Sequence, residues 1–127
     1  MINFLIAFSD MLEKYGDVHY MDLPRDINGF AKVDDIEIVY DLSGGVSRYA
    51  NDTRQDITLM VDIWGNKSRV FDMELVVAEL EKIHRCKFDC EDGIYLVDRD
   101  NLFRNNLGDE DKNIMRIRLQ YLVRKLN

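Results

Sequence analysis

The sequence predicts a single α+β domain over residues 1–127, with a mainly antiparallel sheet of four to five strands packed with two helices. Three observations predict this class. Helical periodicity occurs in two segments, strand-like alternation occurs in several others, and the two kinds of segment do not alternate regularly along the chain. The 127 residues are 46% hydrophobic and 32% charged, which is the balance of one folded domain rather than of a disordered chain.

Two segments, residues 2–15 and 68–85, have the apolar spacing of amphipathic helices. Gly16 is placed to end the first helix, and Ser68 is placed to cap the second. The predicted apolar face of the second helix comprises Met73, Val76, Val77, Leu80, Ile83 and His84, widened by Phe71, Leu75 and Ala78. A stripe of this breadth predicts a helix that lies flat on the sheet.

The clearest strand is residues 55–64, where apolar side chains occupy alternate positions. Weaker signals predict the other extended segments, which are residues 18–22, 36–40, 94–97 and 114–126. Two intervening stretches, residues 41–53 and 99–112, are polar and contain the Gly, Ser, Asn and Asp residues typical of loops. We therefore expect both stretches to be loops that leave the sheet.

The charge balance limits the kinds of partner. Seventeen basic and 24 acidic residues give a formal net charge of −7, which argues against a protein that coats nucleic acid or binds an anionic membrane. No apolar run approaches the ~20 residues of a membrane-spanning helix. The apolar N-terminus has no basic residue before it, so we expect it to be a helix of the mature protein rather than a signal peptide. Two cysteines suit a reducing cytoplasm as the site of synthesis.

The segment from His84 to Cys90 is the first candidate for chemistry. His84, Cys86 and Cys90 could supply three zinc ligands, but a closed site needs a fourth, and His19 is far away in sequence. We favour the alternative that the cysteines are small hydrophobic residues at a helix-to-strand junction. The sequence has no phosphate-binding loop and no nucleophile elbow. We therefore expect no catalytic, metal or cofactor site.

Three arginines lie on one face of the last predicted strand. Arg116, Arg118 and Arg124 could form a contact surface for an acidic partner or for passing DNA. Alternatively, they pair across the sheet with Asp56 and Asp62 on the polar face of the central strand. We slightly favour cross-strand pairing for Arg116 and Arg118.

The order of segments along nearly the whole chain is also distinctive. An opening helix is followed by the stretch VHYMDLP, a strand before a polar loop, and the segment QDITLMVDIWGN at residues 55–66. A long helix, a weak strand pair, an acidic loop and the terminal strand MRIRLQYLV follow. In this layout the chain resembles the tail terminator, or tail completion, family of long-tailed bacteriophages and prophages, whose members are often called minor capsid proteins. Residues 26–35 depart from the family pattern because many relatives pass quickly into the strand here.

The resemblance implies a structural virion protein that is not an enzyme and needs no cofactor. Family members form a ring, typically a hexamer, on the head-proximal end of the tail tube, where the ring stops tube polymerisation and joins the tail to the head connector or stopper. The implied partners are further copies of the chain, the major tail tube protein and the connector, with DNA passing through the bore; the implied location is the head–tail junction of the virion. The residues expected at subunit or partner contacts are Ser43, Arg48, Tyr49, Arg99, Arg104, Arg116, Arg118 and Arg124.

Three alternatives remain open at this point. The chain could be another neck component, such as a head completion or stopper protein. It could be a small metal-dependent enzyme built on His84, Cys86 and Cys90, or a monomeric binding module that uses the basic stripe.

Overall fold

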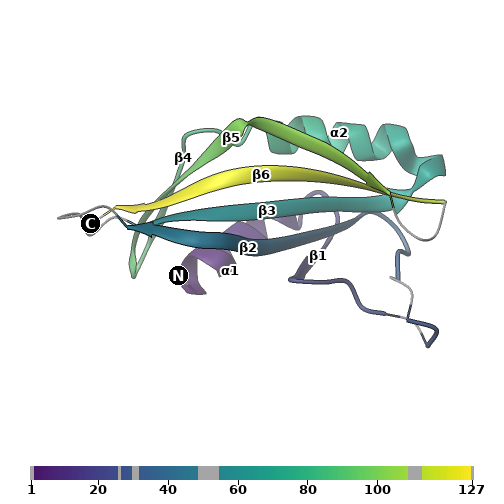
Figure 1. Cartoon of the computed structure of the whole chain (residues 1–127), viewed down its shortest axis with the longest axis horizontal. Coiled ribbons are helices and arrows are strands. Elements are labelled where there is room, and N and C mark those ends of the chain that lie inside the picture. The colour runs from purple at the N-terminus through teal and green to yellow at the C-terminus, as the bar shows by residue number, and fades with distance from the viewer. Residues whose placement is uncertain (1, 26, 30–31, 49–54, 109–112, 127) are drawn as a thin grey trace.

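A six-stranded sheet runs the length of the domain, and both helices lie on one of its faces (Figure 1). The computed structural model describes residues 2–25, 27–29, 32–48, 55–108 and 113–126, without the side chains of residues 43–48, 55–56, 101–105 and 108. In chain order the elements are α1 (Ile2–Leu12), β1 (Asp17–Tyr20), β2 (Glu37–Arg48), β3 (Gln55–Asn66), a 3-10 turn (Lys67–Arg69), α2 (Val70–Glu81), β4 (Cys86–Cys90), β5 (Gly93–Gly108) and β6 (Ile114–Leu126). Within the described ranges, no helix is both long enough and apolar enough to cross a membrane.

The sheet is larger than predicted, and it is mixed. Its strand order is β1-β2-β3-β6-β5-β4, and every neighbouring pair is antiparallel except β1 and β2, which are parallel. The α+β class is confirmed, whereas the expectation of four to five strands is wrong. The strand that the prediction lacks is β4 at one edge of the sheet, because a strand of five residues has too few alternating positions to stand out in the sequence.

The central pair, β3 and β6, separates the two faces of the sheet. Side chains alternate along both strands, and one set is buried beneath the helices, as predicted. This buried set comprises Ile57, Leu59, Val61 and Ile63 on β3 and Ile117, Leu119, Tyr121 and Val123 on β6. The opposite set faces away from the helices and contains most of the charged residues of the two strands, so we call that side the outer face.

Aromatic packing holds α1 against the sheet. Phe4, Phe8 and Leu12 are fully buried, and the Phe4 ring stacks on Tyr95 of β5 with 5.0 Å between the ring centroids. Phe4 also meets the edge of the Phe88 ring on β4, at 5.4 Å. Such aromatic contacts stabilise the packing beyond the apolar area that they bury. The helix ends at Leu12, before the predicted end at residue 15.

The two stretches predicted as loops are largely strand. β2 continues to Arg48 and β5 continues to Gly108, and each strand has a register shift where its sequence looks most loop-like. In β2 the shift falls between Ser43 and Ser47, and in β5 it falls between Arg99 and Arg104. Extra residues at such irregularities are accommodated without ending the ladder. The remaining parts of both predicted loops include residues outside the described ranges.

The second helix differs from its prediction at both ends. Asn66, rather than Ser68, caps the turn before it, because the Asn66 side chain accepts a hydrogen bond from the backbone N–H of Ser68 at 3.0 Å. The helix ends at Glu81 instead of residue 85. Arg85 has a φ of 55°, in the left-handed region, so the chain turns out of the helix and into β4.

The segment between β1 and β2 covers one end of the outer face. Leu23 and Val33 pack with three residues of the sheet in a second, smaller cluster, which contains Val39, Trp64 and Ile114. The backbone N–H of Lys32 donates to the carbonyl oxygen of Pro24 at 2.8 Å, which closes the segment. The segment therefore contributes Leu23 and Val33 to a small hydrophobic cluster on the outer face.

Tyr121 connects β6 to the end of α2, and its titration provides a test of that connection. Its hydroxyl donates to the carbonyl oxygen of Leu80 at 2.5 Å, and burial raises the pKa of this hydroxyl to about 12 from an ordinary 10.0. Between these two pH values the folded state retains a proton that the unfolded state has lost. We expect the free energy of unfolding to fall through this window by about 1.4 kcal/mol per pH unit from this group.

Urea unfolding at intervals from neutral pH to about pH 12 measures this dependence. Tyr121→Phe is the control: it should cost about 1 kcal/mol at neutral pH through the lost hydrogen bond and should flatten the alkaline slope. Equal alkaline slopes for the two proteins would contradict the assignment of this titration to Tyr121.

Candidate partner interface

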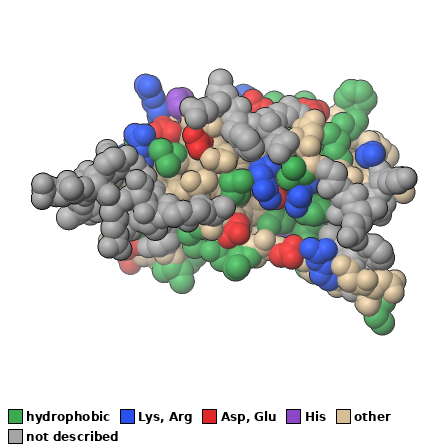
Figure 2. Space-filling view, in the orientation of Figure 1, with side chains coloured by type: hydrophobic (Ala, Val, Ile, Leu, Met, Phe, Trp, Pro, Cys, Tyr) green, Lys and Arg blue, Asp and Glu red, His purple; other side chains and the backbone are tan. Residues whose placement is uncertain are grey.

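The arginines of β6 lie on the outer face of the sheet, where basic and acidic side chains lie together near the middle of the face (Figure 2). Arg118 forms two hydrogen bonds with Asp62 of β3, Nε to Oδ1 at 2.8 Å and Nη2 to Oδ2 at 3.0 Å. These two residues are also direct partners in the register. Bidentate pairs of this kind are the strong form of the arginine–carboxylate interaction. The favoured interpretation, cross-strand pairing, is observed for Arg118.

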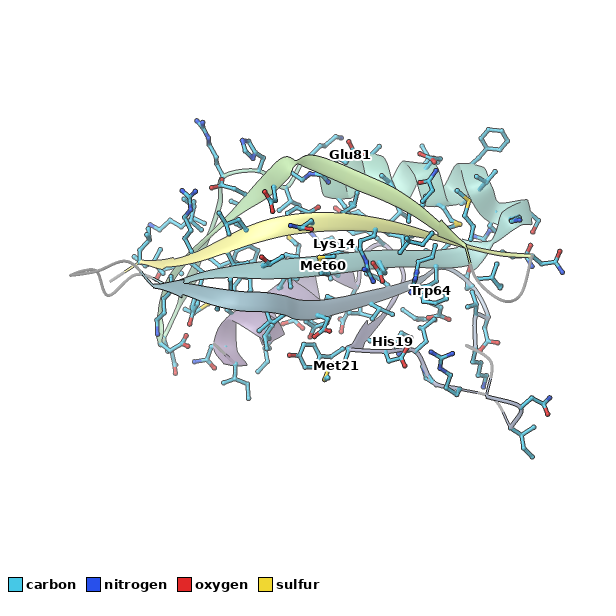
Figure 3. The ribbon with its side chains drawn as sticks, in the orientation of Figure 1. Lys14, His19, Met21, Met60, Trp64 and Glu81 are labelled. Atoms are coloured by element: carbon cyan, nitrogen blue, oxygen red, sulfur yellow. The ribbon has the colours of Figure 1, made fainter. Side chains whose placement is uncertain are left out.

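Arg116 belongs to the same cluster. Its Nη1 lies 3.9 Å from Oδ2 of Asp62, and its guanidinium lies over the Trp64 ring, 4.7 Å from the ring centroid. Trp64 lies near the end of β3 and is 4% exposed (Figure 3). A guanidinium over a tryptophan face is attracted by the ring quadrupole and also shields the ring from water. Arg116 is therefore occupied with structural contacts within the chain.

Arg124 has a looser environment. The register places Asp56 opposite it, but the Asp56 side chain is outside the described set, and the nearest recorded carboxylate is Asp98 of β5. Nη1 of Arg124 lies 3.9 Å from Oδ2 of Asp98, and the arginine side chain is 37% exposed. Of the three arginines, Arg124 has the most exposed side chain.

Arg99 lies on the other side of the sheet. It is 6% exposed, and its guanidinium lies over the Tyr121 ring at 5.5 Å, beneath the end of α2. Its backbone N–H donates to Nδ1 of His84 at 3.2 Å. Arg99 is predicted at a subunit or partner contact, whereas in the isolated chain its guanidinium packs in the interior. Of the other predicted contact residues, Tyr49 lies outside the described residues, and so do the side chains of Ser43, Arg48 and Arg104.

The candidate zinc ligands do not converge on one point. Cys86 and Cys90 are both on β4 and are partly buried against the main core, and His84 precedes the strand, with its ring nitrogen bound to β5. Burial raises the pKa of the Cys90 thiol, and Asp92 and Asp89 add to this effect. In the part of the chain that the structure describes, no three His, Cys, Asp or Glu side chains are placed to hold a metal ion together.

Two exposed apolar pairs are the feature that the sequence interpretation missed. Phe71 and Leu75 on α2 are 83% and 67% exposed, and Ile2 and Ile6 on α1 are 70% and 55% exposed. Each pair is four residues apart and so lies on one helix face. The prediction that Phe71, Leu75 and Ala78 widen the buried stripe is wrong. At about 100° per residue these three lie opposite the buried side chains, so α2 has two apolar faces, and only one of them meets the sheet.

Exposed apolar pairs are unusual enough to require an explanation. A single exposed apolar side chain is ordinary, but adjacent large ones on one face often mark a surface that another molecule covers. The region around α2 is polar, with the ion pairs Arg69–Asp72 and Lys82–Glu79 near its two ends. The arrangement on α2 is therefore an apolar strip within a charged surface, which is typical of a protein contact.

The chain matches no protein-family model and no curated protein.

The Asp62 cluster on the outer face can be tested directly. Asp62 is 7% exposed, so Asp62→Ala leaves the guanidinium of Arg118 without its two hydrogen bonds in a partly buried position. We expect a loss of about 2 kcal/mol in the free energy of unfolding, measured in urea. Asp34→Ala is the matched control, because Asp34 is exposed and lies 4.0 Å from Lys32. It should change stability by less than about 0.5 kcal/mol. Equal losses for the two variants would mean that the cluster contributes no more than a surface pair.

Proposed function

We propose that the chain is a structural virion protein that forms a ring, typically a hexamer, on the head-proximal end of a phage tail tube. In this role it stops tube polymerisation and provides the surface that joins the tail to the head connector. The proposal rests on the segment order along the chain, which resembles the tail terminator family. The observation that carries the assembly part of it is the exposed pair of Phe71 and Leu75 on α2.

A closed ring requires each subunit to offer two different surfaces. A contact repeated head to tail uses one patch on each subunit and a second, different patch on its neighbour. The exposed pairs on α1 and α2 are two separate apolar patches on two separate helices. Their presence supports an assembly with heterologous contacts, because a two-fold dimer needs only one such patch.

Apolar contacts also suit the charge of the chain. Copies that carry −7 each repel one another, so an assembly of like subunits needs a favourable contribution that does not depend on charge. Burying the side chains of Phe71 and Leu75 would supply a few kcal/mol per contact by removing apolar area from water. The tube protein, the connector and DNA passing through the bore are the further partners of this proposal.

Native mass across a concentration series tests the ring, with light scattering coupled to size exclusion. We expect a discrete oligomer near six subunits, and we expect Phe71→Ser/Leu75→Ser to shift the protein to monomer by weakening each contact about 100-fold or more. Both positions are exposed, so the thermal midpoint of the isolated domain should change little.

Met21→Ser/Ile27→Ser is the matched control. It also removes two exposed apolar side chains, which are 64% and 100% exposed, but from the segment between β1 and β2. A wild-type protein that stays monomeric at every concentration would contradict a self-assembling ring. Loss of the oligomer in both double variants alike would contradict a specific role for the α2 face.

A further inference from the structure

A second feature lies at the corner where α2 gives way to β4. A hollow of about 750 Å³ opens there beside β5 and β6, away from the exposed apolar face of α2. Its lining comprises His84, Arg85, Leu96, Asp98, Arg99, Asp100, Leu122 and Arg124. Arg85 and Arg124 give this lining two guanidinium groups that reach solvent, in a chain whose net charge is −7, whereas the guanidinium of Arg99 packs over the Tyr121 ring in the interior.

Asp98 organises the cationic side of the hollow. Its Oδ1 accepts the backbone N–H of Arg85 at 3.0 Å, Nδ1 of His84 lies 3.9 Å from the same oxygen, and Nη1 of Arg124 lies 3.9 Å from Oδ2. The Asp98 side chain is only 16% exposed, whereas those of His84 and Arg124 are 51% and 37% exposed. This inner carboxylate thus holds the backbone of Arg85 and lies beside His84 and Arg124, whose side chains reach solvent.

One hydrogen bond of His84 determines which of its ring nitrogens can donate to a ligand. Nδ1 accepts the backbone N–H of Arg99 at 3.2 Å, so the neutral ring carries its proton on Nε2. This contact also occupies the N–H of Arg99, just past the last residue of β5 that pairs with β4. The half-exposed ring therefore offers an N–H donor to a ligand and holds the edge of β5 at the same time.

Arg85 is the most available donor of the group. It is exposed, and among the described residues its guanidinium forms no hydrogen bond or ion pair. Its backbone has a φ of 55°, a conformation that is strained for an arginine and that glycine adopts freely. A strained, exposed arginine beside a hollow suggests a function in binding, because stability alone would favour glycine at this position.

We propose that this hollow binds an acidic peptide segment, with an Asp or Glu carboxylate between Arg85, Arg124 and His84. Leu96 and Leu122, both partly exposed, provide an apolar floor for the residue next to that carboxylate. A polyphosphate fits less well, because it would leave the apolar floor of Leu96 and Leu122 without a complementary contact. The inference concerns a surface other than the α2 face and does not depend on ring formation.

Fluorescence anisotropy with two labelled peptides tests the inference, one alternating Glu and Leu and the other alternating Gln and Leu. The Glu peptide should bind the wild-type chain about tenfold more tightly than the Gln peptide, since each charge-assisted contact contributes more than a neutral one. Arg85→Gly should remove most of this preference while the thermal midpoint stays at or above the wild-type value, because glycine relieves the backbone strain.

Arg25→Gly is the matched control, since it removes an exposed arginine that pairs with Asp22 in another part of the domain. It should leave the preference for the Glu peptide intact. Equal binding of the Glu peptide by wild type and Arg85→Gly would overturn the inference, and so would tighter binding of inorganic phosphate or of a single-stranded oligonucleotide. The native mass of Arg85→Gly, measured in parallel, reports on ring formation separately, so failure of one proposal does not imply failure of the other.

Discussion

The pairing of β3 with β6 is the constraint on which the rest of the domain depends. Twelve consecutive residue pairs, from Gln55 with Lys125 to Asn66 with Ile114, run without a shift in register. A slip of β6 by one residue would turn Leu119 and its row outward and bring Arg118 and the other arginines of the strand beneath the helices. Because charges buried without partners cost several kcal/mol each, the central pair admits one register. The helices, the short edge strands and both bulged strands are arranged around it.

The apolar rows on the inner face and the charged side chains on the outer face require the same register of β3 and β6. On the inner face the buried rows of β3 and β6 receive Phe8 of α1 and Met73 of α2. On the outer face Asp62 is placed directly across from Arg118, so the register that buries the apolar rows also closes the ion pair. Agreement between two independent interactions is what gives a sequence one preferred structure. The irregular parts of β2 and β5 pair with β3 and β6 on one side only, beyond the residues that β1 and β4 reach, so a single neighbour fixes each strand there.

The elements that could be predicted from the sequence are those with a local signal. Both helices, the central strands and the division of β6 into an apolar and a basic row follow from periodicity alone. The sheet beyond residues 41 and 99 could not be predicted in this way, because a bulged strand has the same Gly, Ser and Asn composition as a loop. Only the neighbouring strand distinguishes the two. Similarly, the end of α2 depends on the left-handed Arg85, which the hydrogen bond to Asp98 supports.

The contact residues were harder to predict, because side chains far away in sequence determine whether a residue is free to contact another molecule. A basic row on β6 can be seen in the sequence, but only the structure shows that Arg116 and Arg118 contact Asp62 and Trp64 within the chain. The exposed face of α2 was hidden for a different reason. Phe71 and Leu75 are apolar and so predict a wider buried stripe, but their angular position on the helix places them opposite Met73.

The two surfaces proposed for binding differ in the force that each would use. Contact through Phe71 and Leu75 brings together copies that each carry −7, so salt that screens their repulsion favours that contact. Binding of an acidic segment at Arg85 and Arg124 relies on attraction between unlike charges, and the same salt weakens it. The sign of the salt dependence is therefore opposite at the two surfaces. An acidic chain can in this way keep self-assembly and the capture of an acidic partner physically separate.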